Sequence, residues 1–324
     1  MSNINPLRIK KEVTRLILKE KTEPESLNRL RRLVTRLEDP SPYLQELRNR
    51  EQGYHYECQL QFFLDRILYQ FHPTIILHDI RIPIGHTSFQ IDCLLLTMNF
   101  GLLIEIKSSS GTMSFTNNGR FFNYDKGEMH NPITQVLEQR DRLIDFLGVN
   151  NYFFEHVVCV GNSRVSVETD DSSNWVLERI IPFEQLKNFI NNMFQKYSQS
   201  IITKDRMINI GNYLKSSHQE KLHRYNVHPN LVQPGVICPS CKRLGMERKR
   251  YNWYCKHCKC DSKYAHHEDI LDWFSFKSSD KLTNTTCRNF LGVNSETTAY
   301  TLLNNCNLIR PIGKNRGRYY ILKE

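Results

Sequence analysis

The chain has 324 residues, of which 40% are hydrophobic and 24% are charged. This composition excludes a disordered protein, and no apolar run reaches the roughly 18 residues that a membrane span requires. Residues 234–324 hold 16 Lys and Arg against 8 Asp and Glu, so they contribute +8 of the formal net charge of +10 and the rest contributes +2. A basic C-terminal region favours a polyanionic partner, foremost nucleic acid, and a solvated basic surface is the alternative.

Residues 1–46 form the first predicted segment, which is helical. Apolar residues recur at helical spacing in LRIKKEVTRLILKE and in ESLNRLRRLVTRLED, and Pro40 and Pro42 end the pattern. The N-terminus is basic but lacks the apolar core and the small-residue cleavage site of a signal peptide. We therefore expect a cytoplasmic protein without a membrane partner.

Residues 47–195 have the pattern of an α/β domain, in which helices flank a mixed β-sheet. A helix over residues 54–69 is followed by a strand over residues 74–84, where Pro83 indicates a sheet edge. Two apolar runs separated by MNFG predict a β-hairpin, and TMSFTNNGRFFNYD predicts a second, shorter one. The remaining predicted elements are a helix over residues 132–147, a strand over 153–163, and a short strand followed by a helix over 175–194.

Three charged residues interrupt the apolar hairpin FQIDCLLLTMNFGLLIEIKSSSG. Asp92 lies on its first strand, and Glu105 and Lys107 lie two residues apart on its second, so these two side chains share one face. If the strands pair, two carboxylates converge beside an amine, and like charges that close favour a bound cation. Carboxylate oxygens favour Mg²⁺ or Mn²⁺, the ions that activate water for phosphodiester hydrolysis, and Lys107 can orient that water or stabilise the phosphate. A surface salt bridge is the alternative interpretation.

The sequence QID followed by IEIKSSSG resembles the core of the NERD domain, the nuclease-related domain of the restriction-endonuclease-like superfamily. The resemblance covers about residues 50–160 and implies a restriction-endonuclease-like fold with nuclease chemistry. The family's motif is an Asp followed by Glu-x-Lys, which implies that Asp92, Glu105 and Lys107 are catalytic.

The resemblance also implies further site residues. The family's Gly-x-x-Gly-Glu run matches Gly53 and Glu57, although Tyr56 replaces the second glycine, and it makes Glu57 a third metal ligand. Gln90 matches the glutamine before Ile-Asp, and Gln135 of NPITQ matches the family's Asn-Pro-x-x-Gln. Solvated helix positions are the alternative for Glu57 and Gln135, and a pocket that has lost catalysis is the alternative for the whole site.

Residues 196–235 predict a helix followed by a linker, and residues 236–264 predict a zinc ribbon. Two Cys-x-x-Cys pairs with thirteen residues between them have the spacing of a structural, four-thiolate Zn²⁺ site. The predicted ligands are Cys238, Cys241, Cys255 and Cys258. His257 and Cys260 are alternative ligands with a poorer spacing, and two redox-active pairs are the alternative to a metal site.

Residues 265–324 resemble a winged helix, with a helix over HEDILDWFSF, a helix-turn-helix around Gly292 and a basic terminal hairpin. The resemblance implies that the second helix of the pair enters DNA and that the hairpin contacts the DNA backbone. The DNA-binding residues predicted in this way are Ser295, Thr297, Thr298 and Thr301 on the helix, and Lys314, Arg316 and Arg318 on the wing. Because the predicted recognition helix lacks Arg and Lys, strong base recognition is not evident, and a protein-binding winged helix is the alternative.

Together these features predict a metal-dependent nuclease that hydrolyses phosphodiester bonds in DNA, with the zinc ribbon and the winged helix as targeting modules. A catalytically inert DNA-binding regulator and an RNA-directed nuclease are the competing functions. The intact acids beside Lys107 favour the nuclease, since a protein that only binds DNA does not need them.

Overall fold

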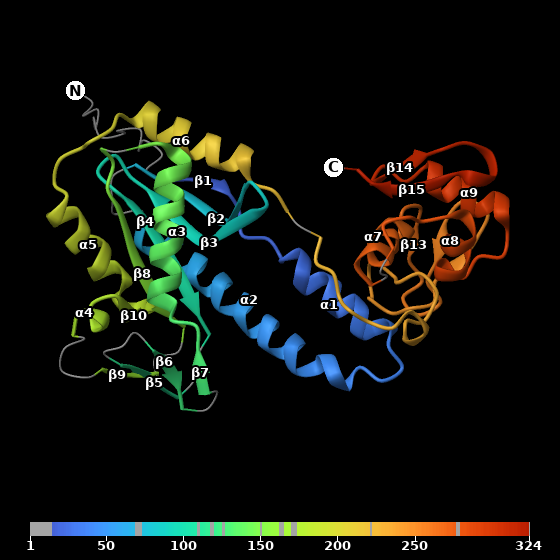
Figure 1. The fold of residues 1–324 in the computed structure, drawn as a ribbon, viewed down its shortest axis with the longest axis horizontal. Coiled ribbons are helices and arrows are strands. Elements are labelled where there is room, and N and C mark those ends of the chain that lie inside the picture. Colours follow the sequence, from blue (N-terminus) through green and yellow to red (C-terminus); the bar gives the residue numbers. More distant parts are fainter. Residues whose placement is uncertain are drawn as a thin grey trace, which may run out of the picture. The chain divides into compact units, whose positions relative to one another are not determined.

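The computed structural model describes residues 15–68, 73–108, 111–116, 120–124, 127–149, 151–161, 165–169, 174–220, 222–276 and 279–323. The chain divides into two compact units (Figure 1). The first unit is formed by Met1–Thr22 and Gln52–Glu220, and the second unit is formed by Glu23–Glu51 and Lys221–Glu324.

The first unit is an α/β structure. Its helices are α2 (Ser41–Ile67, which begins in the second unit), α3 (Pro132–Leu147), α4 (Asn174–Leu177), α5 (Leu186–Lys196) and α6 (Lys204–Ser217), with a 3₁₀ turn at Phe183–Gln185. Its strands are β1 (Arg15–Lys19), β2 (Thr74–Ile84), β3 (Thr87–Leu96), β4 (Gly101–Lys107), β5 (Thr112–Phe115), β6 (Phe121–Asn123), β7 (Gly127–Met129), β8 (Phe154–Val160), β9 (Ser166–Thr169) and β10 (Ile180–Pro182).

A six-stranded mixed sheet forms the centre of this unit, in the order β1-β2-β3-β4-β8-β10. Strands β2, β3 and β4 are antiparallel neighbours, whereas β1 is parallel to β2, β8 is parallel to β4, and β10 is parallel to β8. A smaller sheet has the order β7-β6-β5-β9. The mixed sheet with flanking helices confirms the predicted α/β class, and the pairing of β3 with β4 confirms the predicted hairpin.

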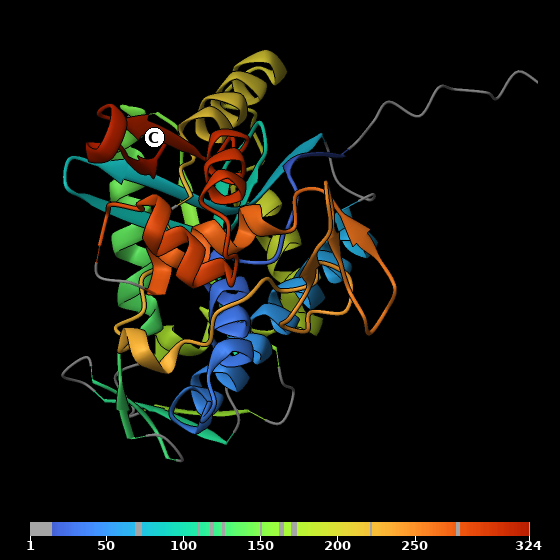
Figure 2. The ribbon, with the colours of Figure 1, turned by 90° about the vertical axis from the view of Figure 1, so that its right-hand side faces the viewer.

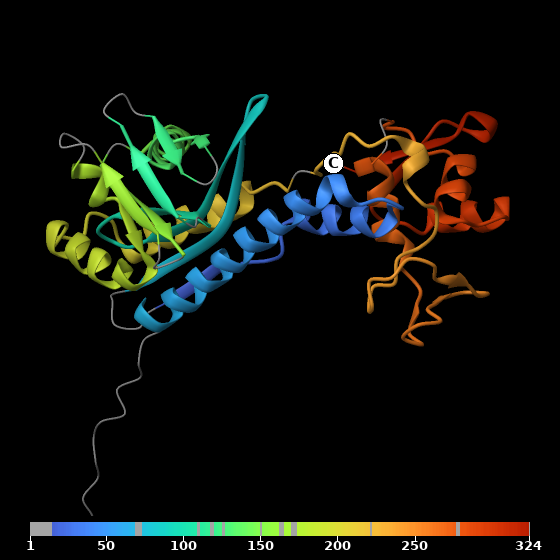
Figure 3. The same cartoon turned by 90° about the horizontal axis from the view of Figure 1, so that it is seen from below.

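Helices cover both faces of the central sheet. Buried residues of α3 and α6 pack on one face, and buried residues of α5 and the end of α2 pack on the other. Figure 3 views the sheet from its edge, with α3 on one side and α2 and α5 on the other. Each face of the sheet therefore contributes apolar side chains to a core that helices cover.

The predicted N-terminal helix is wrong where the structure describes that segment. Leu16 to Leu18 lie in β1, where Ile17 packs into one core and Leu18 into the other, which is the alternation of a strand. The backbone groups at the start of β2 form hydrogen bonds with an extended segment, here β1. This pairing with a distant strand outweighs the local helix propensity that the apolar spacing indicated. The other apolar residues of that pattern, Leu7, Ile9 and Val13, lie outside the described residues.

The predicted edge position of the strand over residues 74–84 is also wrong, because β2 lies between β1 and β3. Strand β1 pairs only with Thr74 to Leu77. Pro83 lies beyond the residues of β2 that pair with β1, so the N–H that proline lacks removes no hydrogen bond between β1 and β2.

The second unit has small elements, and those of its C-terminal part are drawn in orange and red in Figure 2. Its helices are α1 (Glu25–Arg36), α7 (His266–Phe276), α8 (Asn284–Leu291) and α9 (Glu296–Asn304), with 3₁₀ turns at Pro229–Leu231 and Asn315–Gly317. Its strands are β11 (Glu247–Arg248), β12 (Trp253–Tyr254), β13 (Asp261–Ser262), β14 (Ile309–Ile312) and β15 (Tyr319–Leu322). The first three strands form one antiparallel sheet, and β14 and β15 form a hairpin.

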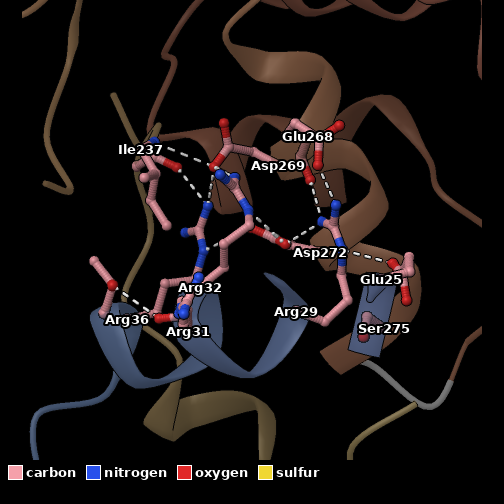
Figure 4. Close-up of polar contacts among 12 residues, drawn as sticks. Glu25, Arg29, Arg31, Arg32, Arg36, Ile237, Glu268, Asp269, Asp272 and Ser275 are labelled. Carbon is pink, nitrogen blue, oxygen red and sulfur yellow. Dashed lines mark hydrogen bonds and ion pairs between the residues drawn. The ribbon is translucent and has the colours of Figure 1, made fainter. Parts of the chain in front are cut away.

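Three arginines of α1 are buried against carboxylates of α7 (Figure 4). Arg36 and Arg32 each contact both Asp269 and Asp272, and the Nη2 atom of Arg32 lies 2.6 Å from Oδ1 of Asp269. The Nη1 atom of Arg29 lies 2.5 Å from Oδ1 of Asp272. Buried charges need partners of opposite sign, so α1 belongs to the core of the second unit.

The predicted segment boundaries therefore cut across the two units. Residues 1–46 contribute β1 to the first unit and α1 to the second, and α6 of the predicted segment 196–235 packs in the first unit against β2. Among the described residues, no helix combines the length and the apolar character that crossing a membrane requires.

Candidate functional site

The carboxyl group of Asp92 lies where β3 and β4 separate. The two strands pair from Leu96 opposite Gly101 to Cys93 opposite Ile104. Beyond this point the Oδ2 atom of Asp92 accepts a 3.0 Å hydrogen bond from the backbone N–H of Ile106. The side chain thus replaces the backbone partner that continued pairing would supply.

Asp79 lies opposite Asp92 on β2, in a conformation that is unusual for a strand. Its φ is 57°, and the register of β2 with β3 is interrupted between the pairs His78–Cys93 and Ile80–Ile91. A positive φ is costly for a residue with a Cβ and marks local strain. This strained residue of β2 lies across from the part of β3 at which the pairing of β3 with β4 ends.

Glu105 is buried at 2% exposure and fully hydrogen-bonded. Its Oε1 atom accepts hydrogen bonds from Lys107 Nζ at 2.7 Å and from Gln135 Nε2 at 2.6 Å. Its Oε2 atom accepts one from Gln139 Nε2 at 3.1 Å. Lys107 also donates to the side-chain carbonyl of Gln135 at 2.9 Å, so a strand and a helix hold these charges together.

The start of α3 explains how NPITQ places Gln135. The Asn131 side chain caps the helix by accepting hydrogen bonds from Ile133 N and Thr134 N, and Pro132 occupies the first turn. Gln135 follows one turn later on the side that faces Glu105. Gln139 lies a further turn along the same face, and the spacing of four residues is the signal by which the sequence could have identified it.

The acidic groups act on one another. Burial raises the pKa of Asp92 well above its usual value, and the charges of Glu105 and Glu57 raise it further. Burial also raises the pKa of Glu57, which the charge of Lys21 opposes. The predicted carboxylates therefore lie in one region of the first unit.

Glu57 belongs to an ion cluster that the sequence did not reveal. Lys21 contacts the carboxylate of Glu57, and its Nζ atom lies 2.9 Å from Oδ2 of Asp79. Gln90 donates a 2.5 Å hydrogen bond to the other oxygen of Asp79. Burial acts to lower the pKa of Lys21, but the charges of Glu57 and Asp79 raise it above its usual value. Asp79 interrupts an apolar strand, which is a usable signal, whereas no pattern marks Lys21.

The departure from the family pattern at Tyr56 has a structural counterpart at Gly161. A Cβ atom at Gly161 would overlap the Tyr56 ring, so the ring occupies the space that a side chain would need. Tyr56 on α2, which stands where the resembled motif has a glycine, therefore packs against a glycine after β8. Glu57 follows directly on the same helix and stays beside the sheet.

The donor set fits a hard divalent cation. Asp92, Glu105 and Glu57 offer the carboxylate oxygens that Mg²⁺ and Mn²⁺ prefer, and a cation would offset the repulsion that raises the pKa of Asp92. Within the described part of the chain, however, these acids do not bring three oxygens within 4.8 Å of one another. Lys21 holds Glu57, and the two glutamines hold Glu105. Asp92 and Glu105 are the pair that the geometry supports best, and Glu57 stays a predicted ligand.

Four cysteines of the second unit form a cluster that can hold a metal ion. The sulfur atoms of Cys238, Cys241, Cys255 and Cys258 all lie within 4.8 Å of one another. The Sγ atoms of Cys238 and Cys258 are 3.5 Å apart, and those of Cys241 and Cys255 are 3.6 Å apart. Hydrogen bonds from the backbone N–H and the side chain of Cys260 lower the pKa of Cys258 to about 6, which favours the thiolate that binds zinc.

The two cysteine pairs are built alike. Lys242 and Lys259, which directly follow the two pairs, have φ of 61° and 62°. Their N–H groups donate to the carbonyls of Cys238 at 3.0 Å and Cys255 at 2.9 Å, which closes a tight turn around each pair. His257 instead contacts Arg243, and the Sγ atom of Cys260 lies outside the four-ligand group but 3.2 Å from that of Cys238.

The C-terminal segment has the predicted element order, with α8, a left-handed turn at Gly292, α9 and the β14–β15 hairpin. Ser295 caps α9 by accepting from Thr298 N at 3.2 Å, and the Thr301 hydroxyl donates to the carbonyl of Thr297 at 2.9 Å. These hydroxyls are thus engaged locally. Arg318 Nη1 donates to the Tyr300 hydroxyl at 3.1 Å, Lys314 is exposed, and the side chain of Arg316 lies outside the described residues.

Residues 52–161 match the family model of NERD, the nuclease-related domain. The match runs from within α2 to the end of β8 and supports the resemblance found in the sequence. It suggests a nuclease-related function. No curated protein matches the chain. Among solved structures, the crystal structure of protein VC1899 from Vibrio cholerae is 12% identical over 50% of this chain and 37% of its own length, with a TM-score of 0.24, which is too low to carry a conclusion.

Proposed function

We propose that this protein is a divalent-metal-dependent nuclease that hydrolyses phosphodiester bonds in DNA. The observation that carries the proposal is that Asp92 accepts a hydrogen bond from the N–H of Ile106, directly after Glu105, where β3 leaves β4, and that the amine of Lys107 is bonded to Glu105. The charge of Glu105 also raises the pKa of Asp92. The nuclease-related family match covers the same residues and supports the same chemistry.

Asp92 and Glu105, with Glu57 as the third ligand, would hold Mg²⁺ or Mn²⁺. When bound, such an ion polarises the phosphate and lowers the pKa of a coordinated water. Lys107 is the only one of these groups with a positive charge, and 27% of its side chain is exposed while Glu105 beneath it is buried. Its amine can therefore reach a phosphate oxygen or the attacking water, and stabilise the negative charge that develops on the phosphate.

The two glutamines of the predicted site have supporting roles. Gln135 bonds both Glu105 and Lys107, so it fixes the amine relative to the carboxylate. Gln90 donates a hydrogen bond to Asp79, and Lys21 forms ion pairs with both Asp79 and Glu57. Gln90 therefore acts on the predicted third ligand only indirectly, through Asp79 and Lys21. Both are positioning residues in this proposal.

The second unit would direct the nuclease to its substrate. The four-cysteine cluster would hold a structural Zn²⁺, since four protein ligands leave no position for a reacting water. The guanidinium group of Arg250 lies 5.0 Å from the centre of the exposed Tyr251 ring, whereas Trp253 is buried in the core of the unit. An exposed ring beside a cation suits contact with a nucleic acid backbone and its bases. The α8–α9 pair and the hairpin would act as a winged helix on DNA.

Cleavage assays with Asp92→Asn test the proposal, because asparagine keeps an oxygen that can accept from Ile106 N. Purified protein is incubated with supercoiled plasmid, linear duplex, single-stranded DNA and structured RNA in Mg²⁺ or Mn²⁺. We expect the wild type and the control variant Asp145→Asn, which changes an exposed acid of α3, to cleave DNA. Asp92→Asn should lose the activity.

The outcomes separate the competing functions. Cleavage of RNA with intact DNA would identify an RNA-directed nuclease. DNA binding without metal-dependent cleavage of any substrate would identify an inert regulator. Equal cleavage by wild type and Asp92→Asn would show that the activity does not reside in this site.

A further inference from the structure

A pocket of about 660 Å³ lies in the C-terminal part of the second unit. The start of α8, the exposed side of α9 and the β14–β15 hairpin form its walls, with Asn284, Glu296, Thr297, Tyr300, Arg318 and Tyr320 among the lining residues. This volume is in the usual range for a small-molecule ligand or a single nucleotide. Thr297 and Arg318 belong to the predicted DNA-binding set, whereas Asn284, Glu296 and Tyr300 have no part in the duplex-reading role predicted for α9.

Asn284 and Glu296 bring hydrogen-bond acceptors to the pocket. The Asn284 side-chain amide donates a 3.0 Å hydrogen bond to the backbone carbonyl of Glu296. Its buried Oδ1 atom accepts no hydrogen bond from the described residues. The Glu296 carboxylate is exposed, and no ion pair involves it within the described part of the chain. The exposed Glu296 carboxylate can therefore accept from a ligand that carries N–H donors, and Oδ1 of Asn284 is an unfilled acceptor at the wall of the same pocket.

Tyr300 and Arg318 bring an aromatic ring and a guanidinium group to the same pocket. Tyr300 is 47% exposed and lies one turn after Glu296 on the same face of α9. Arg318 donates from Nη1 to the Tyr300 hydroxyl and lies 5.7 Å from the centre of that ring, whereas its Nε atom is buried without a hydrogen-bond acceptor among the described residues. An aromatic face beside a cation is the surface on which unpaired bases stack, with their phosphates toward the cation.

We propose that this pocket binds one unpaired nucleotide of a nucleic acid strand. The base stacks on Tyr300, an amino group of the base donates to Glu296 and to Oδ1 of Asn284, and the phosphate contacts Arg318. Guanine, cytosine and adenine carry such an amino group, whereas thymine does not. The inference rests on the proposed function only in taking nucleic acid as the partner, and it assigns recognition to a single-stranded segment.

Competition fluorescence anisotropy tests the pocket on the full-length chain with Asp92→Asn, so that the probe is not cleaved. The probes are fluorescein-labelled oligothymidines in which one central nucleotide is dG, dC, dA or dT, and a blunt duplex of the same length. We expect the amino-bearing bases to improve affinity over the all-thymine strand by on the order of tenfold. Glu296→Gln should reduce this preference, because it replaces one acceptor with a donor.

Further variants separate stacking from hydrogen bonding. Tyr300→Leu should weaken every single-stranded probe by on the order of tenfold, while Tyr300→Phe retains most of the affinity because it keeps the ring. Glu38→Gln, at an exposed glutamate of the same unit, is the matched control and should change nothing.

Equal affinity for all four bases, or affinity that Tyr300→Leu leaves unchanged, would overturn the proposal. Tighter binding of the blunt duplex than of any single strand would do the same and would return α9 to a duplex-reading role. Since the assay uses a cleavage-deficient protein, a failure here is distinct from a failure of the nuclease proposal. A base preference in a wild type that cleaves nothing would overturn the nuclease alone.

Discussion

Gln135 on α3 and Glu105 on β4 are joined by a 2.6 Å hydrogen bond from Nε2 to Oε1. The same glutamine accepts a 2.9 Å hydrogen bond from Lys107, so one amide contacts both the acid and the amine of the candidate site. The two elements come from chain segments about thirty residues apart, and the capped start of α3 fixes their meeting point.

Replacement of this glutamine should impair both catalysis and stability. Gln135→Leu removes hydrogen bonds to two charged groups, each of which contributes about 1.5–3 kcal/mol. We expect kcat for DNA cleavage to fall by about 10- to 100-fold. Glu138→Gln, at an exposed position on the same helix, is the control. A Gln135→Leu protein that melts like the wild type and cleaves at the wild-type rate would contradict the positioning role.

Lys21 should compete with a metal ion for Glu57. Lys21→Met removes the cation that contacts Glu57 and Asp79, so Glu57 becomes free to coordinate. We expect Mn²⁺ affinity, measured by titration calorimetry, to rise by about tenfold, which corresponds to about 1.4 kcal/mol. The gain should vanish in the double variant with Glu57→Gln. Circular dichroism checks folding, since two partly buried acids lose an ion-pair partner. Unchanged Mn²⁺ affinity in a folded variant would exclude Glu57 as a ligand.

Zinc content should distinguish the four cluster cysteines from the fifth cysteine beside them. Cys258→Ser removes one of four sulfur atoms that lie within 4.8 Å of one another, whereas Cys260→Ser leaves all four. We expect about one zinc per chain in the wild type and in Cys260→Ser, and a strong loss of zinc and of thermal stability in Cys258→Ser. The reverse result, measured by elemental analysis and thermal melting, would make Cys260 the fourth ligand.

Glu155 should make the first unit sensitive to acid. Burial acts against its charge, but hydrogen bonds from Lys196, Tyr197 and Arg179 lower the pKa of Glu155 from 4.5 to about 2. Because the folded pKa is lower than the unfolded one, this stabilisation is present above about pH 4.5 and is lost as the pH falls toward 2. Glu155→Gln should cost about 1–3 kcal/mol at pH 7 and reduce the loss of unfolding free energy between pH 5 and 2. Parallel urea titrations of the two proteins check this, and identical pH profiles would count against it.

The buried arginines of α1 should be essential to the second unit. Asp272→Asn removes a fully buried charge that contacts Arg29, Arg32 and Arg36, and we expect a loss of about 3–5 kcal/mol. Arg31→Gln is the matched control, because Arg31 on the same helix makes exposed ion pairs worth less than about 1 kcal/mol. Chemical denaturation followed by tryptophan fluorescence measures both variants. Equal stability of Asp272→Asn and Arg31→Gln would show that α1 does not belong to this core.

Much of the fold and of the candidate site could be predicted from local patterns. The β3–β4 hairpin, the helix over residues 132–147 and the cap at Ser295 agree with the structure because strand alternation, capping and turn chemistry act within a few residues. The cysteine spacing identified the four sulfur atoms that meet, since each pair closes its own tight turn.

The errors and omissions arise from contacts between distant segments. The strand at Leu16 and Ile17, the ion cluster of Lys21 with Asp79 and the burial of Arg36 against α7 each depend on a partner far along the chain. The periodicity of a segment does not identify its distant partner, and the sequence around a charged residue does not show which other charge it will contact in the fold.

The sequence by itself therefore determined which chemical groups the protein carries and on which local elements they lie: the acids and Lys107 on a hairpin, and four thiols on two turns. The tertiary structure alone decided which charges neutralise one another and in which unit α1 is buried. The physical reason is range, because dihedral preferences and turns are set by neighbours in the chain, whereas burial of a charge is stable only when a distant partner of opposite sign is brought to it.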